Sequence, residues 1–249
     1  MRRPLILTSI LFVVLLSAAA SARTHGAEPD PATYFTKNWP TPDGEIITDL
    51  EWGLLDRLNA ATTSIDAAIY DFSRPALRDA LITAKLRGVA VRVVTDDEAR
   101  ASSTSKPFYG ALAAAGIPIV DDADDTRIMH DKYAIVDRQL VWTGSTNWSA
   151  GDIGTNHNNG IAFSSAAVAG VFQYDFDQML GGKFGSAKTA SPATTLPYNG
   201  SPLEIYFSPQ DHALDQVIAE VNEAQTSIDF AIFFFTDDGL RDALLAAVS

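Results

Sequence analysis

The chain has 249 residues, of which 47% are hydrophobic and 20% are charged, so it can bury a full core and is not a disordered protein. It contains 31 acidic and 18 basic residues, and the formal net charge of −13 disfavours non-specific binding to the phosphate backbone of nucleic acids. There is no cysteine, so no disulfide can stabilise the fold.

The first 22 residues have the pattern of a secretory signal peptide. Arg2 and Arg3 precede an apolar run over residues 5–16, and residues 20–22 match the small-residue rule for a leader peptidase. The run is short for a transmembrane helix, which needs about 20 apolar residues. We therefore expect cleavage after Ala22 and a secreted or periplasmic protein; an uncleaved membrane anchor is the alternative. Loss of two arginines would leave 16 basic against 31 acidic residues.

Beyond a Pro-, Thr- and Asp-rich lead-in over residues 23–45, the patterns of strands and helices alternate. Apolar runs predict strands, whereas an apolar residue at every third or fourth position predicts a helix. Strands that alternate with helices indicate a mostly parallel sheet covered on both faces. The predicted strands are 64–72, 89–95, 117–120, 132–136, 140–144 and 160–163, and the predicted helices are 75–87, 108–115 and one with Val168, Phe172, Phe176 and Leu180 on a single face.

The chain contains an internal repeat. Thr226-Ser227-Ile228-Asp229 reproduces Thr63-Ser64-Ile65-Asp66 at an offset of 163 residues, and Leu240 to Leu244 reproduces Leu77 to Leu81 without a gap. We therefore expect a first repeat at 46–182, a Gly-, Ser- and Pro-rich linker at 183–200, and the start of a second repeat at 201–249. The run Phe233-Phe234-Phe235 is expected in a buried strand of this second repeat.

The segment from Met129 to Asp137 contains the side chains best suited to phosphate chemistry. His130 and Lys132 have the same parity on a strand and should point the same way, whereas Asp137 has the opposite parity. A lysine can hold a non-bridging phosphate oxygen while a neutral imidazole attacks phosphorus. Because of this parity, we expect Asp137 to stabilise the turn or to orient a neighbouring residue.

A second group of polar residues follows the next strand. Gly144, Ser145 and Asn147 combine a small residue, a hydroxyl and an amide at a strand end, where they can approach a phosphate closely. The acidic run Asp121, Asp122, Asp124 and Asp125 lacks the spacing and the glycine of a calcium loop, so we expect a solvated turn and no metal site.

With both groups in view, the chain resembles the phospholipase D superfamily. His130, Lys132 and Asp137 match its H-x-K-x4-D motif, and Gly144, Ser145 and Asn147 match the G-S-x-N that follows it. The resemblance runs from about residue 34 to the end. It implies an α-β-α sandwich and phosphodiester cleavage through a covalent phosphohistidine, without a metal or other cofactor.

Carried over by position, the resemblance makes His130 the nucleophile or its acid–base partner and Lys132 a phosphate ligand, and it places Asp137 with them among the catalytic residues. Ser145 and Asn147 would line the oxyanion side, with Gly144 and Asn159 in support. Asn158 departs from the pattern, because the family often has a glutamate there that supports the histidine.

The family places two such motifs face to face, and the repeat offset would put a second one near position 293, beyond this chain. A fragment of a longer two-motif enzyme is the favoured interpretation. A homodimer that brings two copies of His130 together is the alternative, since single-motif members of the family dimerise in that way.

Three functional hypotheses follow. The first is a secreted phosphodiesterase that hydrolyses the headgroup ester of phospholipids and meets a membrane surface transiently. The second is a nuclease of the same superfamily, which the net charge disfavours. The third is an inactive half-enzyme that acts as an interaction module through an uncovered sheet edge and apolar surface.

Overall fold

The computed structural model describes residues 30–40, 46–123 and 127–248. The expected signal peptide at 1–22 and its cleavage site lie outside this range. None of the described helices combines the length and the apolar character that crossing a membrane would require.

The first repeat is built on a seven-stranded sheet of order β1-β9-β8-β7-β4-β5-β6. Among these strands, β4 with β5 and β5 with β6 pair in parallel, and the other neighbours pair antiparallel. The expectation of a mostly parallel sheet therefore holds only for one side, because β7 and β8 form a hairpin and β9 runs back beside it. The strands are β1 Ala32–Phe35, β4 Ser64–Ile69, β5 Ala90–Thr95, β6 Ile119–Asp121, β7 Lys132–Val136, β8 Leu140–Gly144 and β9 Asn159–Phe163.

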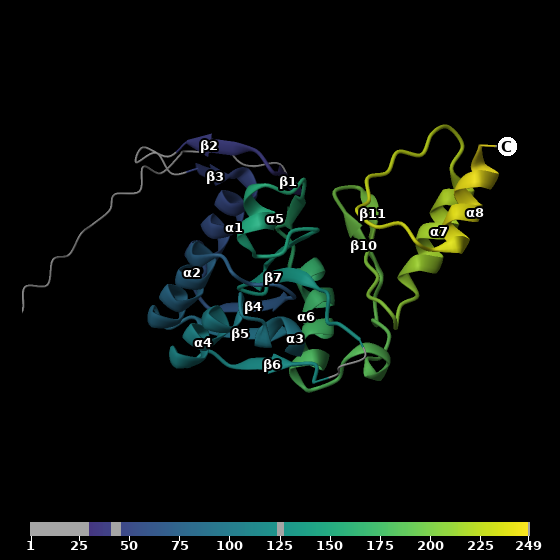
Figure 1. The fold of residues 1–249 in the computed structure, drawn as a ribbon. Coiled ribbons are helices and arrows are strands. Elements are labelled where there is room, and N and C mark those ends of the chain that lie inside the picture. The colour runs from purple at the N-terminus through teal and green to yellow at the C-terminus, as the bar shows by residue number, and fades with distance from the viewer. Residues whose placement is uncertain (1–29, 41–45, 124–126, 249) are drawn as a thin grey trace, which may run out of the picture.

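Helices cover both faces of the sheet, which gives the expected α-β-α sandwich (Figure 1). One face packs against α1 (Asp49–Ala60), α2 (Pro75–Leu86) and α4 (Lys106–Ala114), and the other packs against α6 (Ala166–Leu180). The short helices α3 (Asp97–Ala101) and α5 (Ala150–Gly154) follow β5 and β8.

The helix α2 shows how the sequence determines these elements. Pro75 begins it, because a proline at the first helical position lacks only an N–H that would be unpaired anyway. Leu77, Leu81 and Ala84 are buried on its inner face, as predicted. Gly88 follows its end with a φ of +92°, a backbone conformation that other residues rarely adopt.

Two parts of the N-terminal region differ from the sequence-based expectation. The lead-in contains β1, whose Ala32 and Tyr34 are buried where it pairs with β9. It also contains β2 (Asn38–Pro40), which forms a small sheet with β3 (Ile46–Thr48) at the start of the first repeat. The helix α1 was not predicted, although Thr48 caps it by accepting a hydrogen bond from the Glu51 N–H at 3.2 Å.

The expected linker is partly ordered against the first repeat. It contains a short 3₁₀ helix (Gly185–Ala187) and the strand β10 (Thr195–Tyr198), which pairs with β11 (Ser201–Glu204). Apolar residues of this hairpin, Leu196, Tyr198 and Leu203, pack on the core beside α6. The expected boundary at residue 200 therefore falls inside a β-hairpin.

The second repeat reproduces the helices α1 and α2 of the first repeat but not the strand β4 between them. The helix α7 (Ala213–Glu223) corresponds to α1, and α8 (Asp238–Ala247) begins where the offset of 163 places the counterpart of Pro75. Residues 227–235, the counterpart of β4, form no strand, and Phe233 and Phe234 are 101% and 72% exposed. The prediction of a buried strand is wrong here, because β4 pairs with both β5 and β7 whereas no described strand follows β11.

Candidate active site

The predicted site residues from three strands meet at one end of the sheet. Because β7 is antiparallel to β4, with Lys132 opposite Ile69, the start of β7 lies beside the residue that follows β4, Tyr70. The end of β8 pairs with the start of β9 in the same way, with Gly144 opposite Gly160. The H-x-K segment and the G-S-x-N segment therefore lie at the same end of the sheet.

His130 and Lys132 both contact Tyr70. The His130 ring packs edge-on at 4.8 Å between ring centroids, and the Lys132 ammonium nitrogen lies 5.4 Å from the centroid of the same phenol ring. Lys132 Nζ also donates a hydrogen bond to the His130 carbonyl oxygen at 2.8 Å. The two side chains gather on one side of the chain, as their spacing predicts.

Both groups have lowered pKa values. Partial burial and then the positive charge of Lys132 lower the pKa of His130 from its ordinary 6.5. Burial lowers the pKa of Lys132 to about 8, although Asp131, Asp152 and Asp71 oppose this shift. At neutral pH the site therefore holds a neutral imidazole, which has a free lone pair, beside an ammonium group that is mostly protonated.

The loop that leads into His130 is held by carboxylates. The Met129 N–H donates to Asp96 Oδ2 at 3.2 Å and to Asp122 Oδ2 at 3.0 Å, and Asp122 Oδ1 also accepts from the Asp97 N–H at 3.0 Å. Burial raises the pKa of Asp122. The expectation of a solvated acidic turn is therefore wrong for Asp122, and for Asp121, which is paired with Arg100; Asp124 and Asp125 lie outside the described residues.

Those carboxylates also form an acidic group in which oxygens of Asp96, Asp97 and Asp122 lie within 4.8 Å of one another. Each of them accepts backbone N–H hydrogen bonds, including the caps of α3 that Asp96 and Asp97 provide. Helix capping and loop anchoring account for this group.

Gly144 is required by the close approach of two strands. Its φ is +147°, and a Cβ atom there would lie 2.3 Å from the Asn159 carbonyl oxygen. Ser145 follows and is exposed; its Oγ donates to Asn158 Oδ1 at 2.8 Å and accepts from the Asn159 N–H at 3.1 Å. The Asn159 carbonyl accepts from the Ser145 N–H at 3.2 Å. These contacts use only the backbone of Asn159, so a supporting role for its side chain stays a prediction.

Asn147 is held by a carboxylate that sequence reasoning missed. Its Nδ2 donates to Asp152 Oδ2 at 2.6 Å, and Asp152 also accepts hydrogen bonds from Asn156 and Asn158. Within the described residues, the buried Oδ1 of Asn147 has no hydrogen-bond partner. A phosphate contact by Asn147 stays a prediction, because the geometry shows its amide bound to α5.

Asp152 supplies negative charge close to His130 and Lys132. Its field acts to raise the pKa values of both His130 and Lys132. The family's glutamate is replaced by Asn158 here, and Asn158 Nδ2 donates to the Asp152 carbonyl oxygen at 3.1 Å. The only sequence signal for Asp152 was its position in the first turn of a short helix capped by Ser149.

Asp137 is not part of this site. It lies past the opposite end of β7, where it accepts hydrogen bonds from the N–H groups of Thr62, Thr63 and Ser64 at 2.9, 2.7 and 2.9 Å, and from both threonine hydroxyls. These bonds lower the pKa of Asp137 although burial opposes the shift. Its assignment as a catalytic residue is therefore corrected, and its expected service to the turn is confirmed.

The sandwich fold and the paired H-x-K and G-S-x-N segments define a phospholipase D-type domain. The profile of the family described as "Cardiolipin synthase, PLD-like domain" matches residues 54–180, which is half of the chain. The chain therefore belongs to the phospholipase D superfamily.

Its curated relatives match about half of the chain. The mitochondrial cardiolipin hydrolases of Xenopus tropicalis and Homo sapiens are 34% and 37% identical over 126 residues, which is 51% of this chain and 59% and 49% of theirs. The chain thus spans about half the length of these curated relatives. Among solved structures, the phospholipase D family member Nuc from Salmonella typhimurium matches 61% of this chain and 95% of its own, with 28% identity and a TM-score of 0.53. NucT from Helicobacter pylori shares the fold at 19% identity and a TM-score of 0.51, over 61% of this chain and 98% of its own.

Proposed function

We propose that the protein is a phosphodiesterase that hydrolyses the headgroup phosphodiester of phospholipids. The main support is the pairing of a neutral His130 imidazole with the Lys132 ammonium group at the start of β7. The superfamily membership supports hydrolysis of a phosphodiester, and the names of the cardiolipin hydrolases support a lipid substrate. The acidic composition, 31 against 18 basic residues, disfavours nucleic acid.

The geometry suggests a double displacement. An imidazole nitrogen of His130 bonds to phosphorus while the bond from phosphorus to the headgroup oxygen breaks, and the Lys132 ammonium group stabilises the charge on the phosphoryl oxygens. The leaving alcohol takes a proton from a general acid. Water then attacks phosphorus and loses a proton to the same group, so that the bond to His130 breaks and phosphatidic acid is released.

The proposed general acid is a second histidine, as in a site that combines two H-x-K motifs. The 249 residues contain one H-x-K-x4-D motif, so we propose that a second H-x-K histidine faces His130, from either a second copy of the chain or a longer form of it. We also propose that the protein is exported, in which case N-terminal sequencing of the mature form would begin at Arg23 rather than at Met1.

A matched pair of histidine variants tests the reaction. His130→Asn should reduce phosphatidic acid release from phospholipid vesicles by at least about 10³-fold, since loss of a nucleophile removes the covalent route. His212→Asn is the control, because His212 is exposed on the second repeat and its φ of +51° suits asparagine. EDTA should not change either rate. Equal activity of His130→Asn and the unaltered protein would disprove the proposal.

A further inference from the structure

A cavity of about 710 Å³ opens beside His130, on the side of the sheet that α6 covers. Its volume lies within the range of small-molecule sites, about 300–1,000 Å³. His130 and Asp131 form one part of its lining, and the opposite wall consists of residues 184–186 and 206–209. This wall lies outside residues 54–180, which the family profile matches.

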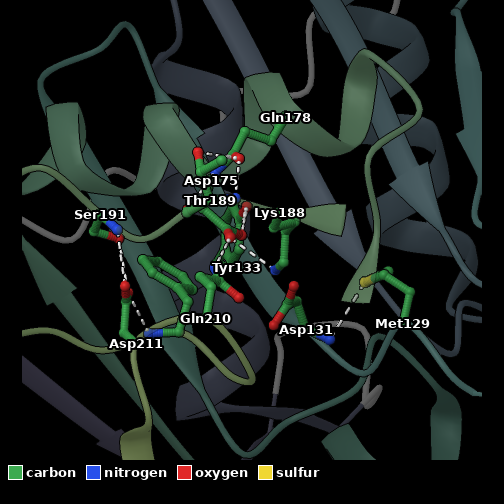
Figure 2. A network of polar contacts seen from close by, with 11 residues as sticks. Met129, Asp131, Tyr133, Asp175, Gln178, Lys188, Thr189, Ser191, Gln210 and Asp211 are labelled. Carbon is green, nitrogen blue, oxygen red and sulfur yellow. Dashed lines mark hydrogen bonds and ion pairs between the residues drawn. The ribbon is translucent and has the colours of Figure 1, made fainter. Parts of the chain in front are cut away.

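The wall is anchored by a buried carboxylate. Figure 2 shows Lys188, Gln210 and Tyr133 converging on Asp175 of α6: Lys188 Nζ and Gln210 Nε2 donate to Oδ1 at 2.8 and 3.0 Å, and the Tyr133 hydroxyl donates to Oδ2 at 3.1 Å. Phe207 packs edge-on against Tyr133 and Phe172, with ring centroids 6.3 and 5.1 Å apart. The strand that follows His130 is thus joined to the wall through fixed contacts.

Two acidic and two basic side chains line the cavity, Asp122 and Asp131 with Arg127 and Lys188. Asp131 and Asp175 lie close to the ammonium groups of Lys132 and Lys188, and burial together with Asp175 raises the pKa of Asp131 to about 6. Met129, Met179 and Phe207 are buried floor residues that offer apolar contact, and Arg127 is exposed at the rim. A ligand with an apolar body and an anionic end fits this lining, since methionine and phenylalanine adapt to apolar groups.

We propose that this cavity binds the glycerol backbone and the first acyl carbons of a phospholipid whose phosphate lies at His130 and Lys132. This inference rests on the proposed function, and it assigns selection of the lipid to a wall outside the family domain. A compact phosphodiester without acyl chains would use the same catalytic pair but leave the cavity empty.

Adjacent serine and alanine positions provide a matched test. Ser186 lines the cavity and Ala187 does not, and both are exposed, so either can accept a large side chain without disturbing the core. With dihexanoyl phosphatidylglycerol, Ser186→Trp should lower kcat/KM about tenfold or more, the scale on which apolar pockets discriminate. With bis(4-nitrophenyl) phosphate the change should stay below about twofold, and Ala187→Trp should change neither rate.

A binding measurement separates this inference from the proposed function. Dihexanoyl phosphatidic acid, titrated into the full chain by calorimetry, should bind the unaltered protein and Ala187→Trp alike and Ser186→Trp about tenfold more weakly. Unchanged binding to Ser186→Trp, or an equal loss of activity on both diesters, would overturn the cavity assignment. Weaker binding by Ser186→Trp without hydrolysis of any diester would retain the cavity and reject the phosphodiesterase.

Discussion

At the scale of residues, the sequence predicted the side chains that depend on local spacing and missed those that depend on the fold. His130 and Lys132 are two positions apart next to a strand, so their common direction follows from the backbone. Asp152 lies on α5 and accepts a hydrogen bond from the Asn147 side chain. Nothing in the local sequence indicates that these two side chains meet. The contact of Tyr70 with both His130 and Lys132 likewise depends on the antiparallel register of β4 and β7.

The two lowered pKa values predict a bell-shaped dependence of kcat/KM on pH. Below the lowered pKa of His130, the imidazole is protonated and has no lone pair for attack, so the rate falls as the pH decreases. Above about pH 8 Lys132 loses its proton and its attraction for phosphate, so the rate falls as the pH increases. The optimum should lie above the lowered pKa of His130 and below about pH 8.

Replacing Lys132 with arginine tests the alkaline limb. An arginine stays protonated throughout this range, so Lys132→Arg should be slower but should shift the alkaline limb to higher pH. Initial rates on a soluble phosphodiester from pH 5 to 10 would measure the effect. An alkaline limb that stays near pH 8 in this variant would show that another group titrates there.

At the scale of elements, runs of apolar residues predicted β7 and β8 with their observed bounds, because both strands are buried in the middle of the sheet. The edge strand β1 has only four residues, too few for a clear period. The helix α1 did leave a signal: Leu50, Leu54 and Leu58 recur every four residues behind the Thr48 cap.

Asp137 should stabilise the sheet without taking part in catalysis. Asp137→Asn keeps a residue type that tolerates the φ of +53° but removes the charge that accepts N–H bonds from the turn before β4. We expect a loss of about 1–2 kcal/mol in the free energy of unfolding at pH 7, measured by urea titration with tryptophan fluorescence, and kcat within about twofold.

The stability difference between Asp137→Asn and the unaltered protein should depend on pH. Because the folded state lowers the pKa of Asp137, its contribution is complete above the ordinary value of about 3.9 and is lost as the pH falls below it. The difference between the two proteins should therefore shrink in acid. Asp56→Asn, on the exposed face of α1, is the control and should change stability little. If Asp137→Asn lost activity while its stability stayed unchanged, Asp137 would have a role in catalysis after all.

At the scale of the whole molecule, the repeat predicted the position of α8 but neither α7 nor the state of the segment between the two helices. Helices satisfy their own backbone hydrogen bonds, so α7 and α8 form from local sequence. A strand depends on its neighbours, and residues 227–235 have none among the described strands. The result is an exposed apolar surface that includes Phe230, Ile232, Phe233 and Phe234.

Self-association could thus arise in two ways, through this apolar surface or through a site shared by two copies of His130. We expect the second way to support catalysis. If two copies of His130 share the site, light scattering of the double variant Phe233→Ser/Phe234→Ser should still give twice the chain mass of 26.7 kDa. Its specific activity should then rise as the protein is concentrated and fall as it is diluted, in step with the dimer fraction. A monomeric double variant with full activity per chain would mean that one copy suffices. A dimer without activity would favour the interaction module, because two H-x-K motifs that meet correctly supply both the nucleophile and the general acid.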